Sequence, residues 1–217
     1  MSDGSLSLPA RLCLLAWDTM GTEVSGATRM PQLVRAGALT ELAQRGLLTD
    51  EDGIATPVDL DSETGDPVLD GLLELVRESR PHRWRTWVTL RARFTLDAVR
   101  EQLTAGGYLR AEKRRVLGVF PTVEYVLERG VVVEALRARA RDVLLGPVPV
   151  SEVSERDAAV VALAAAAEPR TLLPGRDRDV PEERVEALAG RCGAAVPVLR
   201  TVVREVRTAM AAASVAE

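Results

Sequence analysis

Apolar side chains recur every three or four residues along most of the chain, which is the spacing of one face of an α-helix. Ser7 with Pro9 and Asp66 with Pro67 have the residue types that cap and open a helix, and Gly46 is a candidate C-cap. The pattern predicts helices over residues 6–17 and 30–45, in a segment beginning at 67, and over residues 84–91, 96–105, 131–144, 154–168, 181–191 and 196–213.

Two segments read instead as β-hairpins. Residues 47–58 contain Asp52-Gly53, a pair that favours a tight turn, and residues 113–127 alternate weakly around Gly118 and Pro121. The Ala-rich helix over residues 154–168 is apolar on all sides, so we expect it near the centre. The predicted fold class is mainly α: a single-domain helical bundle of residues 1–217, ringed by amphipathic helices, with one or two small hairpins.

Composition supports a folded helical protein. Apolar residues make up 47% of the 217 residues and aromatic residues only 3%, so Ala, Leu and Val must fill the core. Lys113 is the single lysine among 28 basic residues, a bias typical of GC-rich bacterial, particularly actinobacterial, genomes. Cys13 and Cys192 lack metal-ligand spacing and are expected to be free thiols. We predict a cytoplasmic protein with peripheral membrane contact, since apolar runs fall short of the roughly 20 residues of a bilayer span.

Charge is strongly segregated along the chain. Residues 77–115 contain eleven basic and four acidic residues, a net charge of +7 in a chain of net charge −4. Such a segment produces a positive field that attracts anionic partners. Trp84 and Trp87 lie inside it and the apolar run 116–121 follows, a combination that favours an anionic membrane surface. A solvated arginine-rich face over a core that contains both tryptophans accounts for the same composition.

Residues for catalysis are not arranged in any familiar motif. His82 is the single histidine, lies beside Pro81 in an arginine-rich turn, and has no evident nucleophile to activate. Glycine-rich phosphate loops and Ca²⁺-binding spacings are also missing from the sequence. We therefore predict a protein that is not an enzyme and that needs no cofactor or metal.

An internal similarity suggests a different class of partner. Residues 35–58 and 99–127 both read as a helix, a Gly-x-Leu step and a hairpin, an order also found in winged-helix modules that bind nucleic acid. The acidic balance argues against this alternative, because phosphate contacts dominate non-specific DNA affinity and residues 50–74 contain nine acids and no base. A protein–protein scaffold that forms a homo-oligomer through residues 116–125 is a third hypothesis.

Several short motifs occur in a recognisable order. They are Leu-Ser-Leu-Pro at 6–9 with Leu-Cys-Leu-Leu-Ala at 12–16, Leu-Thr-Glu-Leu-Ala-Gln-Arg-Gly at 39–46, Thr-Gly-Asp-Pro-Val-Leu-Asp at 64–70, the Trp87 region, Gly-Tyr-Leu at 107–109, and the run 112–125. Over residues 6–168 their order and spacing resemble the Golgi phosphoprotein 3 family. The resemblance implies a mostly helical domain with an exposed β-hairpin. It also implies a non-enzymatic, peripheral membrane protein that binds phosphatidylinositol 4-phosphate and can serve as an adaptor for client proteins.

The resemblance also implies site residues. In the family a tryptophan and three basic residues hold the lipid headgroup. The first basic position falls on Arg35, and the other two fall on Arg93 and Leu96, with Arg91 and Arg100 as substitutes. Guanidinium groups suit this role because they bind phosphate oxygens in pairs. The alternative for Arg35 is an ion pair with an acid such as Glu41 or Asp66.

The tryptophan of the family's headgroup pocket has no counterpart in this sequence, whereas the family's exposed hairpin has one. The family tryptophan falls on Gly26, with no aromatic residue nearby, so this part of the pocket is absent or rebuilt. The family's exposed hairpin, which contributes to membrane insertion or self-association, corresponds to residues 116–125 and keeps the apolar side chains Leu117, Val119 and Phe120.

Overall fold

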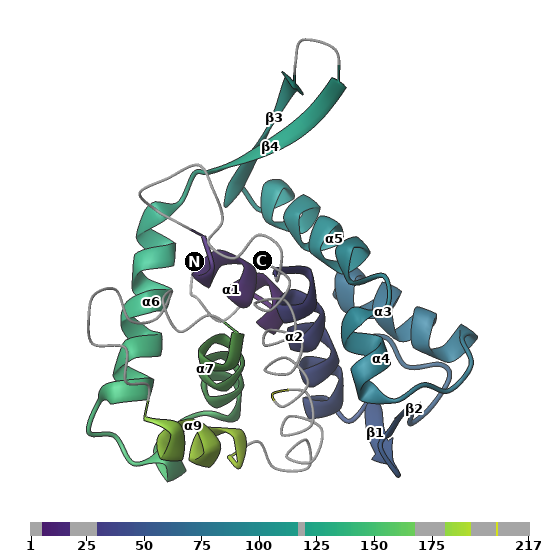
Figure 1. The fold of residues 1–217 in the computed structure, drawn as a ribbon, viewed down its shortest axis with the longest axis vertical. Coiled ribbons are helices and arrows are strands. Elements are labelled where there is room, and N and C mark those ends of the chain that lie inside the picture. The colour runs from purple at the N-terminus through teal and green to yellow at the C-terminus, as the bar shows by residue number, and fades with distance from the viewer. Residues whose placement is uncertain (1–5, 18–29, 117–119, 168–180, 192–202, 204–217) are drawn as a thin grey trace, which may run out of the picture.

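The computed structural model describes residues 6–17, 30–116, 120–167, 181–191 and 203, and most of them are helical (Figure 1). The remaining regular structure is two antiparallel two-stranded sheets, so the mainly helical class with small hairpins is confirmed. The elements are α1 Leu8–Leu15, α2 Met30–Gln44, β1 Leu48–Glu51, β2 Ile54–Pro57, α3 Pro67–Glu78, α4 Trp84–Thr89, α5 Ala92–Ala105, β3 Leu109–Val116, β4 Phe120–Leu127, α6 Gly130–Leu145, the short 3₁₀ helix Val150–Glu152, α7 Glu155–Ala167 and α9 Glu182–Ala189.

Most boundaries agree with the sequence pattern, and the exceptions are informative. Helix α5 begins at Ala92, four residues before the predicted start, because its first turn buries only Ala92 and Thr95, which give a weak apolar signal. The second hairpin begins at Leu109 rather than at residue 113. The helix predicted over residues 196–213 lies outside the described residues, apart from Val203.

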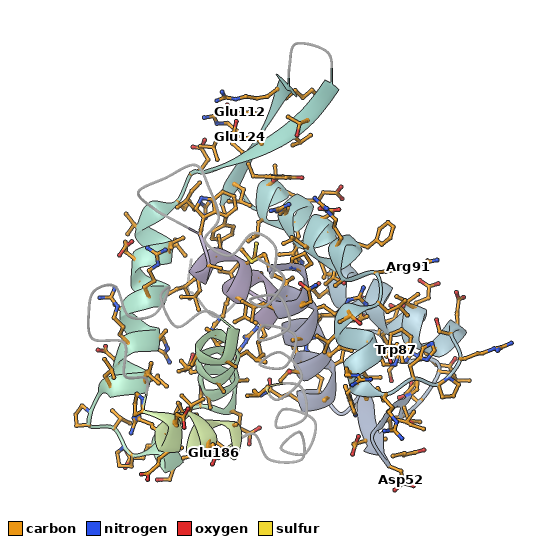
Figure 2. All side chains as sticks on the ribbon, in the orientation of Figure 1. Asp52, Trp87, Arg91, Glu112, Glu124 and Glu186 are labelled. Atoms are coloured by element: carbon orange, nitrogen blue, oxygen red, sulfur yellow. The ribbon has the colours of Figure 1, made fainter. Side chains whose placement is uncertain are left out.

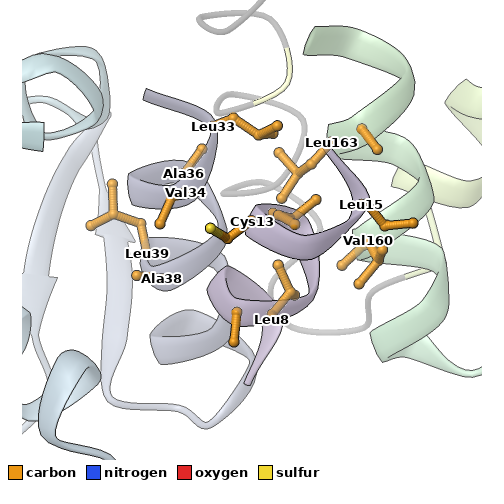
Figure 3. Close-up of a cluster of buried hydrophobic side chains, with 14 of the residues drawn as sticks. Leu8, Cys13, Leu15, Leu33, Val34, Ala36, Ala38, Leu39, Val160 and Leu163 are labelled. Carbon is orange, nitrogen blue, oxygen red and sulfur yellow. The ribbon is translucent and has the colours of Figure 1, made fainter. Parts of the chain in front are cut away.

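Helix α2 occupies the centre of the helical packing. It packs against α1, α3, α4, α5 and α7, and its side chains from Leu33 to Ala43 are buried on every side. The Ala-rich helix α7 is buried as predicted, but it contacts α2 from one flank (Figure 3). Cys13 of α1 is a free, fully buried thiol in this cluster, and desolvation raises its pKa to about 12. Such a thiol is unreactive at neutral pH.

A glycine allows α1 and α2 to approach closely. A Cβ atom at Gly37 of α2 would lie 2.6 Å from Leu12 Cδ1, 2.9 Å from Leu8 Cδ2 and 3.3 Å from Pro9 Cα of α1. Two leucine ends can shift, but the Pro9 backbone atom cannot move without displacing α1. The close packing of these two helices therefore depends on the missing side chain.

We predict that Gly37→Ala lowers the free energy of unfolding by about 1–3 kcal/mol through overpacking. Gly71→Ala in α3 is the matched control, since Gly71 is exposed, helical and has nothing within 4 Å of its added Cβ. That control should stabilise the protein by about 0.5–1 kcal/mol through helix propensity. Urea unfolding of both variants measures the difference. Equal effects of the two substitutions would contradict the close-packing argument.

A buried carboxylate, Glu41 of α2, joins three parts of the chain. Its Oε2 accepts a 2.6 Å hydrogen bond from the backbone N–H of Leu8, and its Oε1 lies 2.6 Å from Arg45 and 3.5 Å from Arg156. Ser7 occupies the N-cap position of α1, but its side chain makes no capping hydrogen bond. The first turn of α1 is thus capped by Glu41 from another helix, whereas Asp66 caps α3 as the sequence predicts.

A second buried carboxylate, Asp157, links α7 to α1 and α6. Its oxygens lie 3.3 Å from Arg11 of α1 and 2.7 Å from Arg139 of α6, and Ser154 Oγ donates a 2.6 Å hydrogen bond to it. Burial alone would raise the pKa of Asp157, but the bonds from Arg139 and Ser154 and the charges of both arginines outweigh burial and lower that pKa.

We predict that Asp157→Asn lowers the free energy of unfolding by about 2 kcal/mol at neutral pH. Because the folded-state pKa is depressed, the stabilisation by the carboxylate is complete above the unfolded-state pKa of about 3.9 and is lost as pH falls through the folded-state pKa. Denaturation of both proteins between pH 7 and pH 3 should therefore show the two stabilities converging in acid. A constant difference across that range would contradict the assignment.

Candidate functional site

Part of the positive charge of residues 77–115 is neutralised in the folded chain. Acidic partners lie near four of its arginines: Arg77 near Asp59, Arg100 near Asp97, Arg110 near Glu112 and Glu128, and Arg114 near Glu112 and Glu124. Five exposed arginines make no ion pair with the residues that the structure describes: Arg80, Arg83, Arg85, Arg91 and Arg93. These five flank or belong to α4 and the start of α5, so the positive field is concentrated there.

The two tryptophans of this segment belong to the core. Both Trp84 and Trp87 are 0% exposed, and α4, which contains them, packs against α2. Trp84 Nε1 donates a 2.5 Å hydrogen bond to Asp50 Oδ1. The rings of Trp87 and His82 pack edge to face, with 5.3 Å between the two ring centroids. The interpretation of these tryptophans as interfacial anchors is therefore wrong, and the core alternative is correct.

Arg35 is a buried cation without a counter-ion among the described residues. It projects from α2, is 1% exposed, and donates one hydrogen bond, from Nη2 to the carbonyl oxygen of Arg91 at 2.8 Å. Its Nε and Nη1 atoms have no hydrogen-bond partner in the described part of the chain, and burial lowers its pKa to about 10. Neither Glu41 nor Asp66 pairs with it, since Glu41 binds Arg45 and Arg156, and Asp66 caps α3.

The N-terminal end of α5 lies directly beside this guanidinium. Arg91 precedes the helix in a left-handed conformation, with φ 50° and ψ 30°, and its side chain makes no capping bond. Its carbonyl oxygen accepts from Arg35 Nη2 and also from the backbone N–H of Phe94, at 3.0 Å. A 14-residue helix presents free N–H groups and a partial positive charge at this end. Arg91 and Trp87 lie together on this side of the molecule (Figure 2).

The structure thus brings Arg35 and Arg91 into contact and places Arg93 in the adjoining first turn of α5. Arg100 lies seven residues further along the helix, where its guanidinium sits 5.1 Å from the centre of the Tyr125 ring of β4. That contact places Arg100 at the hairpin end of α5. Gly26, the counterpart of the family tryptophan, lies outside the described residues.

The β3–β4 hairpin projects away from the helices (Figure 1). Its strands pair in register from Leu109 opposite Leu127 to Val116 opposite Phe120. Glu112 and Glu124 lie along it and bind its own arginines (Figure 2). Leu117 and Val119 lie outside the described residues, and of Phe120 only the backbone position in β4 is described.

A family model for Golgi phosphoprotein 3 (GPP34) matches residues 8–206. The chain belongs to this family. Membership in the Golgi phosphoprotein 3 family is consistent with a lipid-binding role, and the family is one of lipid-binding and adaptor proteins rather than enzymes. Among curated proteins, no match to the chain is found. Within the described residues, no helix of this family member is both long enough and apolar enough to cross a bilayer.

Two components of the site were missed by sequence reasoning. The free N–H groups of α5 were missed because the helix was predicted to begin at Leu96, and nothing in the sequence marks Arg91 as left-handed. Phe94 was missed although a helical projection of residues 92–105 would have found it. That projection places Phe94 opposite the apolar stripe formed by Leu96, Val99 and Leu103.

Arg35 should lower the stability of the unliganded protein, because it keeps a charge in an apolar setting. We predict that Arg35→Met, which removes the charge but keeps most of the volume, raises the free energy of unfolding by about 1–2 kcal/mol. Arg35→Ala should lower it, since it leaves a cavity. Thermal and urea unfolding distinguish the two. Equal destabilisation by both variants would mean that the charge is already compensated within the chain.

Proposed function

We propose that this protein binds an anionic phospholipid headgroup, of the phosphatidylinositol 4-phosphate type, and thereby associates peripherally with a membrane in the cytoplasm. The observation that carries the proposal is Arg35, a buried guanidinium beside a helix N-terminus without a side-chain cap, with two nitrogens that have no hydrogen-bond partner among the described residues. Arg91 and Arg93 are exposed at the same end of α5 and supply further charge. No catalytic step or cofactor forms part of the proposal.

A phosphate monoester supplies the negative charge and the hydrogen-bond acceptors that Arg35 lacks among the described residues. Buried charged groups in folded proteins are normally paired, so a buried cation without a counter-ion among the described residues supports an anionic ligand. Phosphate oxygens accept paired hydrogen bonds from a guanidinium and are stabilised by the N–H groups and partial charge of a helix N-terminus. Arg35 and the first turn of α5 offer both kinds of donor to one ligand.

Access to Arg35 requires a local movement, since the side chain is 1% exposed. The junction between α4 and α5 is suited to that movement. Arg91 has a backbone φ of 50°, a conformation that costs a non-glycine residue of order 1 kcal/mol or more. An entering phosphate can replace the Arg91 carbonyl as acceptor for Arg35, which releases this junction.

The β3–β4 hairpin is a second element of the proposal. Burial of Leu117, Val119 and Phe120 at the membrane would add a few kcal/mol at about 25 cal/mol per Å² of apolar surface. The same residues, within 116–125, are the candidate surface for a homo-oligomer or for client proteins. Nucleic acid is the less favoured partner, because Arg110 and Arg114 of this wing-like hairpin pair with glutamates of the hairpin or its immediate flank.

Vesicle co-sedimentation tests the proposal. Neutral vesicles, vesicles with phosphatidylserine, and vesicles with phosphatidylinositol 4-phosphate are compared at two salt concentrations. We expect salt-sensitive binding to the anionic vesicles, strongest with the phosphoinositide, and a loss of about tenfold or more in Arg35→Met and in Arg93→Gln, by analogy with a lost charge-assisted bond.

Arg110→Gln is the charge-matched control, because it removes one exposed arginine that already has two glutamate partners. It should bind like the wild type. Phe120→Asp separates the hairpin roles: it should weaken vesicle binding if the hairpin enters the membrane, and dissociate an oligomer if the hairpin forms one. Absence of wild-type binding to every vesicle would refute the proposed function.

A further inference from the structure

Phe94 is an aromatic side chain that the fold leaves in water. It is 69% exposed, in the first turn of α5. The other Phe, Tyr and Trp side chains whose placement the structure describes, which leaves Phe120 out, are all engaged: the three tryptophans are buried, and Tyr108 and Tyr125 lie under the guanidinium groups of Arg129 and Arg100. The position of Phe94 therefore does not follow from core packing.

Phe94 is directly connected to the candidate headgroup site. Its backbone N–H donates to the Arg91 carbonyl oxygen, the same atom that accepts from Arg35. Side chains on a helix lean towards its N-terminus, so the Phe94 ring extends towards the end of α5 at which Arg91 and Arg93 are exposed. The apolar ring of Phe94 thus lies near cationic side chains at the N-terminal end of α5, where the anion is proposed to bind.

The acidic residues of the same helix face lie further from this end. Asp97 and Glu101 follow Phe94 by three and seven residues, or about 4.5 and 10.5 Å along the axis. Asp97 is also partly neutralised by Arg100 at 3.8 Å. The exposed face of α5 is therefore positive and apolar at the N-terminal end of the helix. The same face is acidic further along the helix, at Asp97 and Glu101.

An anionic bilayer fits this arrangement best. A protein partner normally offers a pocket to a cluster of apolar anchors, whereas Phe94 is a single ring preceded in sequence by two exposed arginines, Arg91 and Arg93. Single aromatic rings among basic residues are typical of interfacial anchors, because the ring enters the acyl boundary while the cations stay with the headgroups. The charge complementarity is that of a phospholipid surface.

We propose that Phe94 inserts beneath the headgroups of an anionic bilayer and so directs the N-terminal end of α5 at the membrane. This inference rests on the proposed function and adds to it the side chain that anchors the site. The helix end then meets the lipid phosphate with its free N–H groups, while Asp97 and Glu101 stay away from the negative surface.

The test compares two serine substitutions at exposed apolar positions. Phe94→Ser should lower the partition coefficient for phosphatidylinositol 4-phosphate vesicles about fivefold or more, given the apolar area of a phenyl ring. Val131→Ser, at an 85% exposed valine at the start of α6, is the control and should bind like the wild type. Since both side chains are exposed, both variants should retain the wild-type circular dichroism spectrum and unfolding midpoint.

A tryptophan at the same position reports insertion directly. Phe94→Trp in vesicles containing brominated acyl chains should show strong quenching that the wild type lacks, because the native Trp17, Trp84 and Trp87 are at most 2% exposed. Unchanged binding of Phe94→Ser together with no added quenching would overturn the inference while leaving the Arg35 site intact. A wild type that binds no vesicle would overturn both. Dissociation of a dimer by Phe94→Ser, without effect on vesicles, would assign Phe94 to a protein contact and overturn the membrane anchor.

Discussion

The candidate site depends on a buried positive charge that the described residues leave uncompensated. Arg35 projects from the central helix α2 into the junction of α4 and α5, and a single backbone carbonyl satisfies part of its guanidinium. The same fold treats its other buried ions differently, since Glu41 and Asp157 each have two or more partners. The contrast separates charges that stabilise the bundle from one that should weaken the empty protein and that we propose binds an anion.

Placing this charge on α2 has a structural logic. A helix that is packed by five others holds its side chains in fixed directions, so a guanidinium on it is oriented before any ligand arrives. The other side of the site is formed by Arg91, whose backbone is in the left-handed conformation, and by the first turn of α5. In the proposed function, a donor held by the core and a strained residue at the helix end would allow an anion to bind without a rearrangement of the core.

Much of the fold was predictable from sequence, because apolar spacing and caps act locally. The cap at Asp66, the hairpins and the burial of α7 all follow from neighbouring residues. Features that depend on distant partners were not predictable: the capping of α1 by Glu41 spans 33 residues, and the neutralisation of Arg110 and Arg114 requires the register of β3 with β4. The same limit applies to the site, where family resemblance located Arg35 but could not tell that Glu41 and Asp66 are engaged elsewhere. The sequence also allowed Trp84 and Trp87 to be either membrane anchors or core residues, and only their burial in the structure decides between the two.

The position of α1 has a consequence for how the chain is made. All eight of its residues are buried, and its ionic partner Asp157 is 146 residues away from Arg11. At a synthesis rate of roughly 5–20 residues per second, those residues take about 7–30 s to appear. During that interval the α1 segment has been made but lacks α6 and α7, against which it packs in the folded protein, so its apolar residues cannot yet be fully buried. The α1 segment is therefore fully enclosed only after most of the described chain has been made.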